Sequence, residues 1–149
     1  MKAVLRYWFS LSATLAALLG VTGIATGQTS PGVKSPTIVS LSSPVQSITL
    51  TGASRINSSD TGCAGLVGAN PNHTIQIPAD SNLRFSLQGA VGSTLLILGD
   101  QGQKFCVQAD QLSNGKVEIP GRWGRGAYRV FVGSRGQRQV EYTLTVSPT

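Results

Sequence analysis

The chain has 149 residues, which is room for one ordinary domain together with processing segments. Only 12% of the residues are charged whereas glycine occurs 18 times, and this combination argues against a charged helical bundle. It is typical of short strands joined by tight turns, and an apolar content of 40% is enough for a packed core, which argues against disorder throughout the chain.

Residues 1–27 have the features of a signal peptide. Two basic residues open the segment, an apolar stretch rich in leucine and alanine follows over residues 7–24, and Ala25 and Gly27 are the small residues that a signal peptidase requires. The alternative is an uncleaved membrane anchor, but polar residues and glycines interrupt the stretch, and its most apolar part is shorter than the roughly 20 residues of a spanning helix. We expect cleavage after Gly27 and no membrane span in the processed protein.

Ten basic and six acidic residues remain after this cleavage, which gives a net charge of +4. A dedicated nucleic-acid binder carries a denser positive charge, and no nucleic-acid-binding motif is present, so nucleic acid is not a predicted partner. Residues 28–44, which follow the cleavage site, are rich in serine, threonine, proline and glycine, which predicts a poorly ordered linker.

From residue 45 onward, apolar and polar residues alternate in short runs, which is the period of a half-buried strand. One continuous apolar run, residues 93–98, is typical of a strand buried on both faces. Turn-forming residues separate the runs. The eight predicted strands cover residues 45–50, 74–77, 83–87, 93–98, 104–108, 116–119, 128–132 and 140–146. Strands at this spacing predict an all-β domain over residues 45–149, a single antiparallel β-sandwich of a jelly-roll-like kind.

Cys63 and Cys106 are the two cysteines of the sequence. An even pair in an exported chain indicates a disulfide bond, and two buried free thiols are the alternative.

His73 is the single histidine and stands at a predicted turn that enters a strand. A catalytic histidine needs a nucleophile and an orienting acid within hydrogen-bond reach, and no serine lies in a nucleophile-elbow motif. We interpret His73 as a turn residue that bonds nearby backbone. The chain is therefore predicted not to be an enzyme, with a hydrolase as the remote alternative.

The six acidic residues are scattered singly, with no Asp-x-Asp loop and no cysteine or histidine cluster. Asp100 and Asp110 flank the strand around Cys106 and are the weak candidates for a calcium site, although such aspartates more often cap turns. We predict no bound cofactor, with calcium as the alternative.

The C-terminal third of the chain is rich in arginine and aromatic residues. Arginine binds phosphate, sulfate or carboxylate through two parallel hydrogen bonds, and aromatic rings stack on sugars. This composition predicts a face that binds an anionic envelope polysaccharide. The alternative is that the arginines form the solvated side of the strands while Trp123 packs over the core. The candidate residues are Arg122, Trp123, Arg125, Tyr128, Arg129, Arg135 and Arg138, together with Tyr142.

Several segments, taken together, resemble a known family. They are residues 62–65, 70–73, 92–97, 100–102, Cys106, 120–134 and 142–146. Over about residues 60–147 the chain resembles the exported β-sandwich modules related to the bacterial pre-peptidase C-terminal domain, in a form common in cyanobacteria. The resemblance implies a non-catalytic appendage, of a kind often attached to secreted proteases, that aids secretion, stability or surface binding. Relatives of this form usually carry an acidic pair just after the second cysteine, whereas this chain has only Asp110 there, which counts against a calcium site.

The resulting hypothesis is a periplasmic or extracellular, non-catalytic module. It would bind or stabilise at the cell envelope, with a polysaccharide or an exported protein as its partner. A purely structural or secretion-accessory domain without a ligand is the alternative.

Overall fold

The computed structural model of the protein describes residues 36–60, 62–136 and 139–149. The predicted signal peptide, and the membrane anchor that is its alternative, lie outside the described residues, as does Arg138 of the predicted ligand face. The described part of the chain contains no helix, and hence none that is long and apolar enough to cross a membrane.

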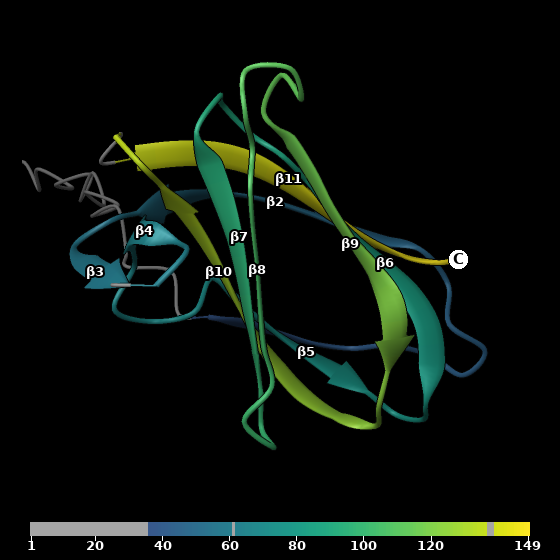
Figure 1. Ribbon diagram of the computed structural model, residues 1–149. Helices are drawn as coiled ribbons and strands as arrows, with labels where there is room; N and C mark the ends of the chain where they lie inside the picture. Colours follow the sequence, from purple (N-terminus) through teal and green to yellow (C-terminus); the bar gives the residue numbers. More distant parts are fainter. Residues whose placement is uncertain (1–35, 61, 137–138) are drawn as a thin grey trace, which may run out of the picture. The chain divides into compact units, whose positions relative to one another are not determined.

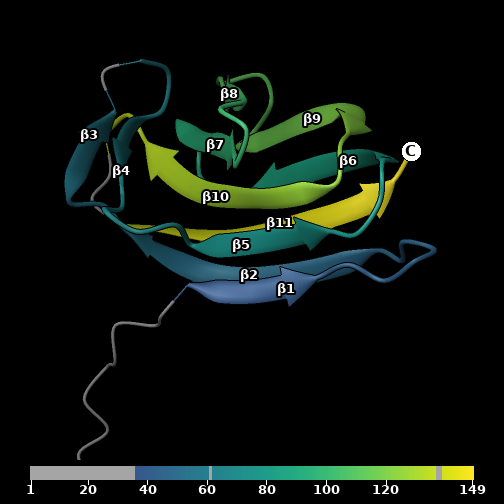
Figure 2. The same ribbon diagram turned by 90° about the horizontal axis from the view of Figure 1, so that it is seen from below.

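Two β-sheets, which we call sheet A and sheet B, pack face to face (Figure 1). Sheet A has the order β1 (Thr37–Ser40), β5 (His73–Ile77), β10 (Gly126–Ser134), β7 (Ser93–Gly99) and β8 (Lys104–Gln108), and the short strands β4 (Gly65–Val67) and β3 (Ser58–Asp60) join it at the end of β10. Sheet B has the order β2 (Ile48–Arg55), β11 (Gln139–Pro148), β6 (Ser81–Gln88) and β9 (Lys116–Trp123). Figure 2 shows β1 and β2 at one edge of the sandwich, and β8 and β9 at the other.

The predicted all-β sandwich is confirmed. Each of the eight predicted strands overlaps one of the strands β2 and β5–β11, and the strands of sheet B pair in antiparallel order throughout. In sheet A the described pairs are antiparallel with one exception, because β1 runs parallel to β5.

The strand β1 lies within residues 28–44, which the sequence analysis interprets as a linker. Just after β1, Leu41 enters the core with 5% of its surface exposed, and its N–H donates to the carbonyl of Gln76 over 2.9 Å. The ordered domain therefore begins before residue 45. The difference arises because the segment's average composition, rich in serine and proline, conceals a four-residue strand (Thr37–Ser40) that depends on β5 for its hydrogen bonds.

The core between the sheets is built from alternate side chains of the strands, as the period of two requires. In β6, for example, Leu83, Phe85 and Leu87 are fully buried. Trp123, at the end of β9, is the largest fully buried side chain and is 2% exposed. Its Nε1–H donates to the carbonyl oxygen of Leu83 over 3.1 Å, so the one polar atom of the ring is paired.

Candidate functional site

A row of cross-strand neighbours runs over the outer face of sheet A and has Arg129 at its centre. In β10, Tyr128 and Val130 point into the core, so Arg129 between them points outward. Arg129 is in register with Thr74 of β5 on one side and with Leu98 of β7 on the other. Such neighbours have Cβ atoms about 4.5–5.5 Å apart, so the three side chains form one surface. We call Thr74, Leu98 and Arg129 the Arg129 surface.

Arg129 is exposed and forms no ion pair with any other described residue. Four other cations, by contrast, are held by carboxylates on the protein: Arg84 and Lys116 by Glu118, Lys104 by Asp60, and Arg122 by Asp80. The side chains of Thr74 and Leu98 are half-buried, so their neighbours in the sheet restrict their movement. The guanidinium of Arg129 is thus available to an anion from outside the described chain.

A hairpin formed by β3 and β4 lies against the same face of sheet A, and we call residues 58–60 and 62–67 the flap. Its Ala64 and Val67 pack on Leu96 and Phe131 of the outer face and form a second, smaller apolar cluster. At the contact, a Cβ on Gly133 would lie 2.5 Å from the carbonyl oxygen of Leu66, so the close approach requires glycine there. The flap therefore covers apolar surface that sheet A would otherwise expose beside Arg129.

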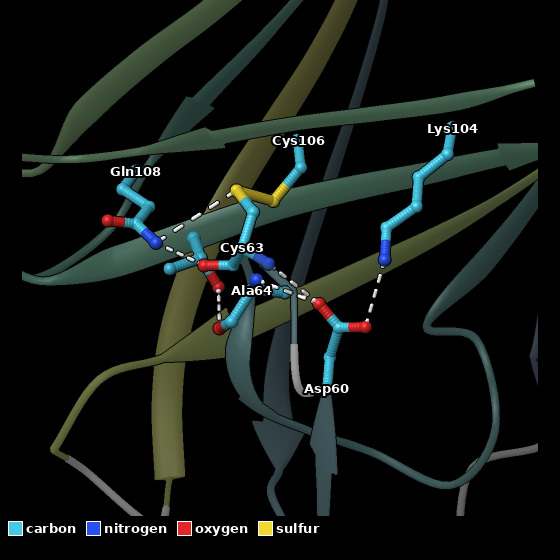
Figure 3. A network of polar contacts seen from close by, with 7 residues as sticks. Asp60, Cys63, Ala64, Lys104, Cys106 and Gln108 are labelled. Atoms are coloured by element: carbon cyan, nitrogen blue, oxygen red, sulfur yellow. Dashed lines mark hydrogen bonds and ion pairs between the residues drawn. A yellow bond between two sulfur atoms is a disulfide. The ribbon is translucent and has the colours of Figure 1, made fainter.

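The predicted disulfide between Cys63 and Cys106 is present and fastens the flap to β8 (Figure 3). Polar contacts surround it. Asp60 accepts hydrogen bonds from the N–H groups of Cys63 and Ala64 at 3.1 and 3.0 Å. It also forms an ion pair with Lys104 at 3.0 Å. The Ala64 N–H first, and then the Lys104 ammonium, hold the pKa of Asp60 below its usual value. Gln108 also donates to the carbonyl of Cys63.

The arginines of the predicted ligand face do not lie on one face. Arg122 is on β9 and points outward from sheet B, whereas Arg129 points outward from sheet A. Arg125 lies in the turn that precedes β10, and Arg135 follows its last residue, so these two stand at opposite ends of that strand. These arginines are close in sequence. Strand parity and strand length nevertheless direct them to different faces and to different ends of the sandwich.

The aromatic residues of the predicted face are buried. Trp123 is 2%, Tyr128 3% and Tyr142 6% exposed, so none presents a ring for stacking on a ligand. Tyr128 donates from its hydroxyl to the carbonyl of Gly124 at 3.1 Å, and burial raises its pKa. For Trp123 the structure agrees with the alternative stated above, packing in the core.

His73 is the first residue of β5 and points into the core with 5% of its surface exposed. Its Nε2 lies 2.8 Å from the hydroxyl oxygen of Tyr142, and the two rings meet edge to face. The sequence predicts a hydrogen bond from His73 to nearby backbone. The structure instead pairs the His73 ring with the side chain of Tyr142. The side chain is enclosed between the sheets, which fits the structural interpretation of His73.

Burial lowers the pKa of His73, so the folded protein holds it neutral. Below pH ~6.5 the unfolded chain binds a proton that the folded chain resists, and stability is lost as the pH falls, with a slope of up to about 1.4 kcal/mol per pH unit. The carboxylates with shifted pKa values have ordinary values of 3.8 to 4.5 in the unfolded chain and lower ones in the folded chain, so they titrate little between pH 7.5 and 5.5. We expect urea unfolding to show this slope over that range in the wild type and to lose it in His73→Gln. An unchanged slope in the variant would contradict the assignment.

Asp100 and Asp110 lie on either side of β8, and each is engaged by backbone. Asp100 accepts from the N–H of Ala127 at 3.1 Å, and Asp110 accepts from the N–H of Ser113 at 2.7 Å. Nowhere in the described ranges do three histidine, cysteine, aspartate or glutamate side chains form a group that could hold a metal ion. Asp110 therefore caps the turn that follows it, whereas Asp100 joins its own turn to the start of β10.

Sequence reasoning missed the neighbours that surround Arg129. The alternation Tyr-Arg-Val-Phe-Val over residues 128–132 already contained the signal that Arg129 faces outward. The register that places Thr74 and Leu98 beside it is set by long-range pairing, which no local pattern in the sequence specifies.

No family model matches the chain, and no curated protein matches it. Among solved structures, the pre-peptidase C-terminal domain of a collagenase from Bacillus anthracis is similar, with a TM-score of 0.52 and 15% identity over 76% of this chain and 95% of that one. Two further structures match at lower TM-scores. A carbohydrate-binding module of Cellvibrio mixtus lichenase 5A has a TM-score of 0.38 at 12% identity, covering 67% of this chain and 90% of that one. PliG, a periplasmic inhibitor of g-type lysozyme from Aeromonas hydrophila, has a TM-score of 0.36 at 16% identity, covering 77% of this chain and all of that one.

The described chain is a disulfide-bonded β-sandwich module. Its fold is that of the pre-peptidase C-terminal domain, as the sequence resemblance implied.

Proposed function

We propose that this domain is an exported, non-catalytic binding module whose Arg129 surface holds an anionic polysaccharide of the cell envelope. One observation carries the proposal. An exposed arginine lies on the central strand of sheet A, between two half-buried neighbours, and no described carboxylate neutralises it.

The chemistry of the surface suits a polysaccharide that bears carboxylate or sulfate groups. A guanidinium forms two parallel charge-assisted hydrogen bonds with such a group. The hydroxyl of Thr74 donates to or accepts from a sugar hydroxyl, and Leu98 offers an apolar contact for the ring. Because all three residues stand on paired strands, little ordering is required when the ligand binds.

The disulfide supports export, because such bonds persist in oxidising compartments outside the cytoplasm. A non-catalytic role is supported by the position of His73 in the core. The recognised anion is expected to be part of a polymer, because a polysaccharide presents many carboxylate or sulfate groups to the same guanidinium and so raises their local concentration.

The test compares two variants that remove the same charge from opposite faces. On immobilised polygalacturonate at low salt, Arg129→Ala is expected to lose about tenfold in affinity, whereas Arg122→Ala on sheet B keeps the wild-type value. Equal losses in both variants would show that only net charge matters. Absence of retention in the wild type, on this polymer and on a sulfated one, would favour the purely structural module.

A further inference from the structure

A second surface, on sheet B, contains an open hollow that the Arg129 surface does not involve. The strand β6 pairs with β11 only as far as Gln88, opposite Thr143, whereas β2 continues along β11 to Arg55, opposite Gln139. At Gly89 the chain leaves the sheet, and its N–H donates to the carbonyl of Gly115. Beside β11 this departure leaves a gap in the sheet.

A shallow, open hollow of about 450 Å³ occupies this place. It is open because several lining residues have little or no side chain. Its lining residues are Thr51, Gly52, Ala53, Gln88, Gly89, Glu141, Tyr142 and Thr143. Thr51 and Thr143 are register partners on β2 and β11 and supply two hydroxyls to the hollow.

Glu141 distinguishes this hollow from ordinary solvated surface. Of the side-chain carboxylates in the described residues, it is the one that has neither an ion pair nor a hydrogen bond. Asp60, Asp80, Asp100, Asp110 and Glu118 each accept at least one bond from the protein. Glu141 is exposed and lies two residues from Thr143 on the outward-facing side of β11, so its charge is free to pair with a ligand.

The neighbouring amide increases the acceptor character of the site. Gln88 donates through Nε2 to the carbonyls of Gly89 and Asn114, at 3.3 and 3.0 Å, and this fixes its side chain. Its Oε1 therefore remains as an acceptor. A carboxylate, an amide oxygen and two hydroxyls together match a ligand that is rich in donors and carries a positive charge.

We propose that this hollow binds an amino sugar. A protonated amine of the sugar would pair with Glu141, and ring hydroxyls would bond with Thr51, Thr143 and the oxygen of Gln88. The hollow and the Arg129 surface lie on opposite outer faces of the sandwich. The amino-sugar site is therefore independent of the polysaccharide site.

The experiment uses one oligosaccharide backbone with and without charge, namely chitosan trisaccharide and its N-acetylated counterpart. Titration of the ¹⁵N-labelled protein, followed by NMR, is expected to shift the amides of Thr51, Gln88 and Thr143 with the amine form and to show at least tenfold weaker binding of the acetylated form. Glu141→Gln is expected to abolish that preference. Glu118→Gln, which removes the same charge from the same sheet, is expected to keep it.

Three outcomes would overturn the proposal. The first is the absence of shifts at the hollow with the amine form. The second is an equal effect of Glu118→Gln and Glu141→Gln, which would reveal non-specific attraction. The third is equal binding of both trisaccharides, because the carboxylate would then have no role. Glu141 is exposed, so the substitution is not expected to impair folding.

Discussion

Replacing Trp123 with alanine is expected to lower the free energy of unfolding by about 3–5 kcal/mol. The indole is 2% exposed and packs against aromatic rings of both sheets. Its ring centroid is 4.4 Å from that of Phe85 and 5.2 Å from that of Tyr128, and a further ring, Phe105 of β8, lies at 4.7 Å. Alanine would leave a cavity that three aromatic rings cannot fill without leaving their places.

Urea unfolding measures this loss, and Trp123→Phe serves as the matched control. Phenylalanine keeps most of the ring contacts but lacks the N–H that pairs with the carbonyl oxygen of Leu83, so a loss of roughly 1–3 kcal/mol is expected. A loss below ~1 kcal/mol for Trp123→Ala would be incompatible with a buried indole, and would restore this residue as a candidate for ligand stacking.

Removing the disulfide by the double substitution Cys63→Ser and Cys106→Ser is expected to cost about 4 kcal/mol. The bond joins residues 43 positions apart, and a loop of that length restricts the unfolded chain by this amount in the chain-entropy model. For a domain of about 110 residues the corresponding fall in Tm is roughly 15 °C. The flap is expected to exchange its amide hydrogens faster than the rest of sheet A, because β4 is joined to β10 by one residue pair.

A reducing agent provides the control for this prediction. It is expected to lower the Tm of the wild type by a similar amount and to leave the double-serine variant unchanged. If the wild type melts at the same temperature with and without the reductant, the sulfur bridge either does not form or contributes nothing to stability.

Most of the fold could be predicted from the sequence because a half-buried strand leaves its own mark, the alternation of apolar and polar residues. The strands β6 and β11 are examples, since the alternation covers residues 82–88 in β6 and the whole of β11. The strands β1, β3 and β4 left no such mark. Each has three or four residues, too few to display a period, and each is stable only through its partner strand or, for the flap, the disulfide.

The candidate site could be predicted only in part, and for a physical reason. Arg129 was found, but it was grouped with Arg122, which lies on the other face of the sandwich. Trp123 and Tyr128 were read as ligand contacts because composition alone does not distinguish the two faces of a strand, whereas their parity with buried neighbours does. The sequence does not single out Glu141, because its lack of a partner is a property of the folded surface.

The proposed binding of an anionic polysaccharide to the outer face of sheet A at Arg129 can be tested residue by residue. The most direct measurement is the map of amide chemical-shift changes when a short oligogalacturonate is added to the ¹⁵N-labelled protein. The changes are expected to centre on Thr74, Leu98 and Arg129 and to be weak on sheet B. Changes centred on β2, β6 or β9, or no changes at millimolar oligosaccharide, would contradict it.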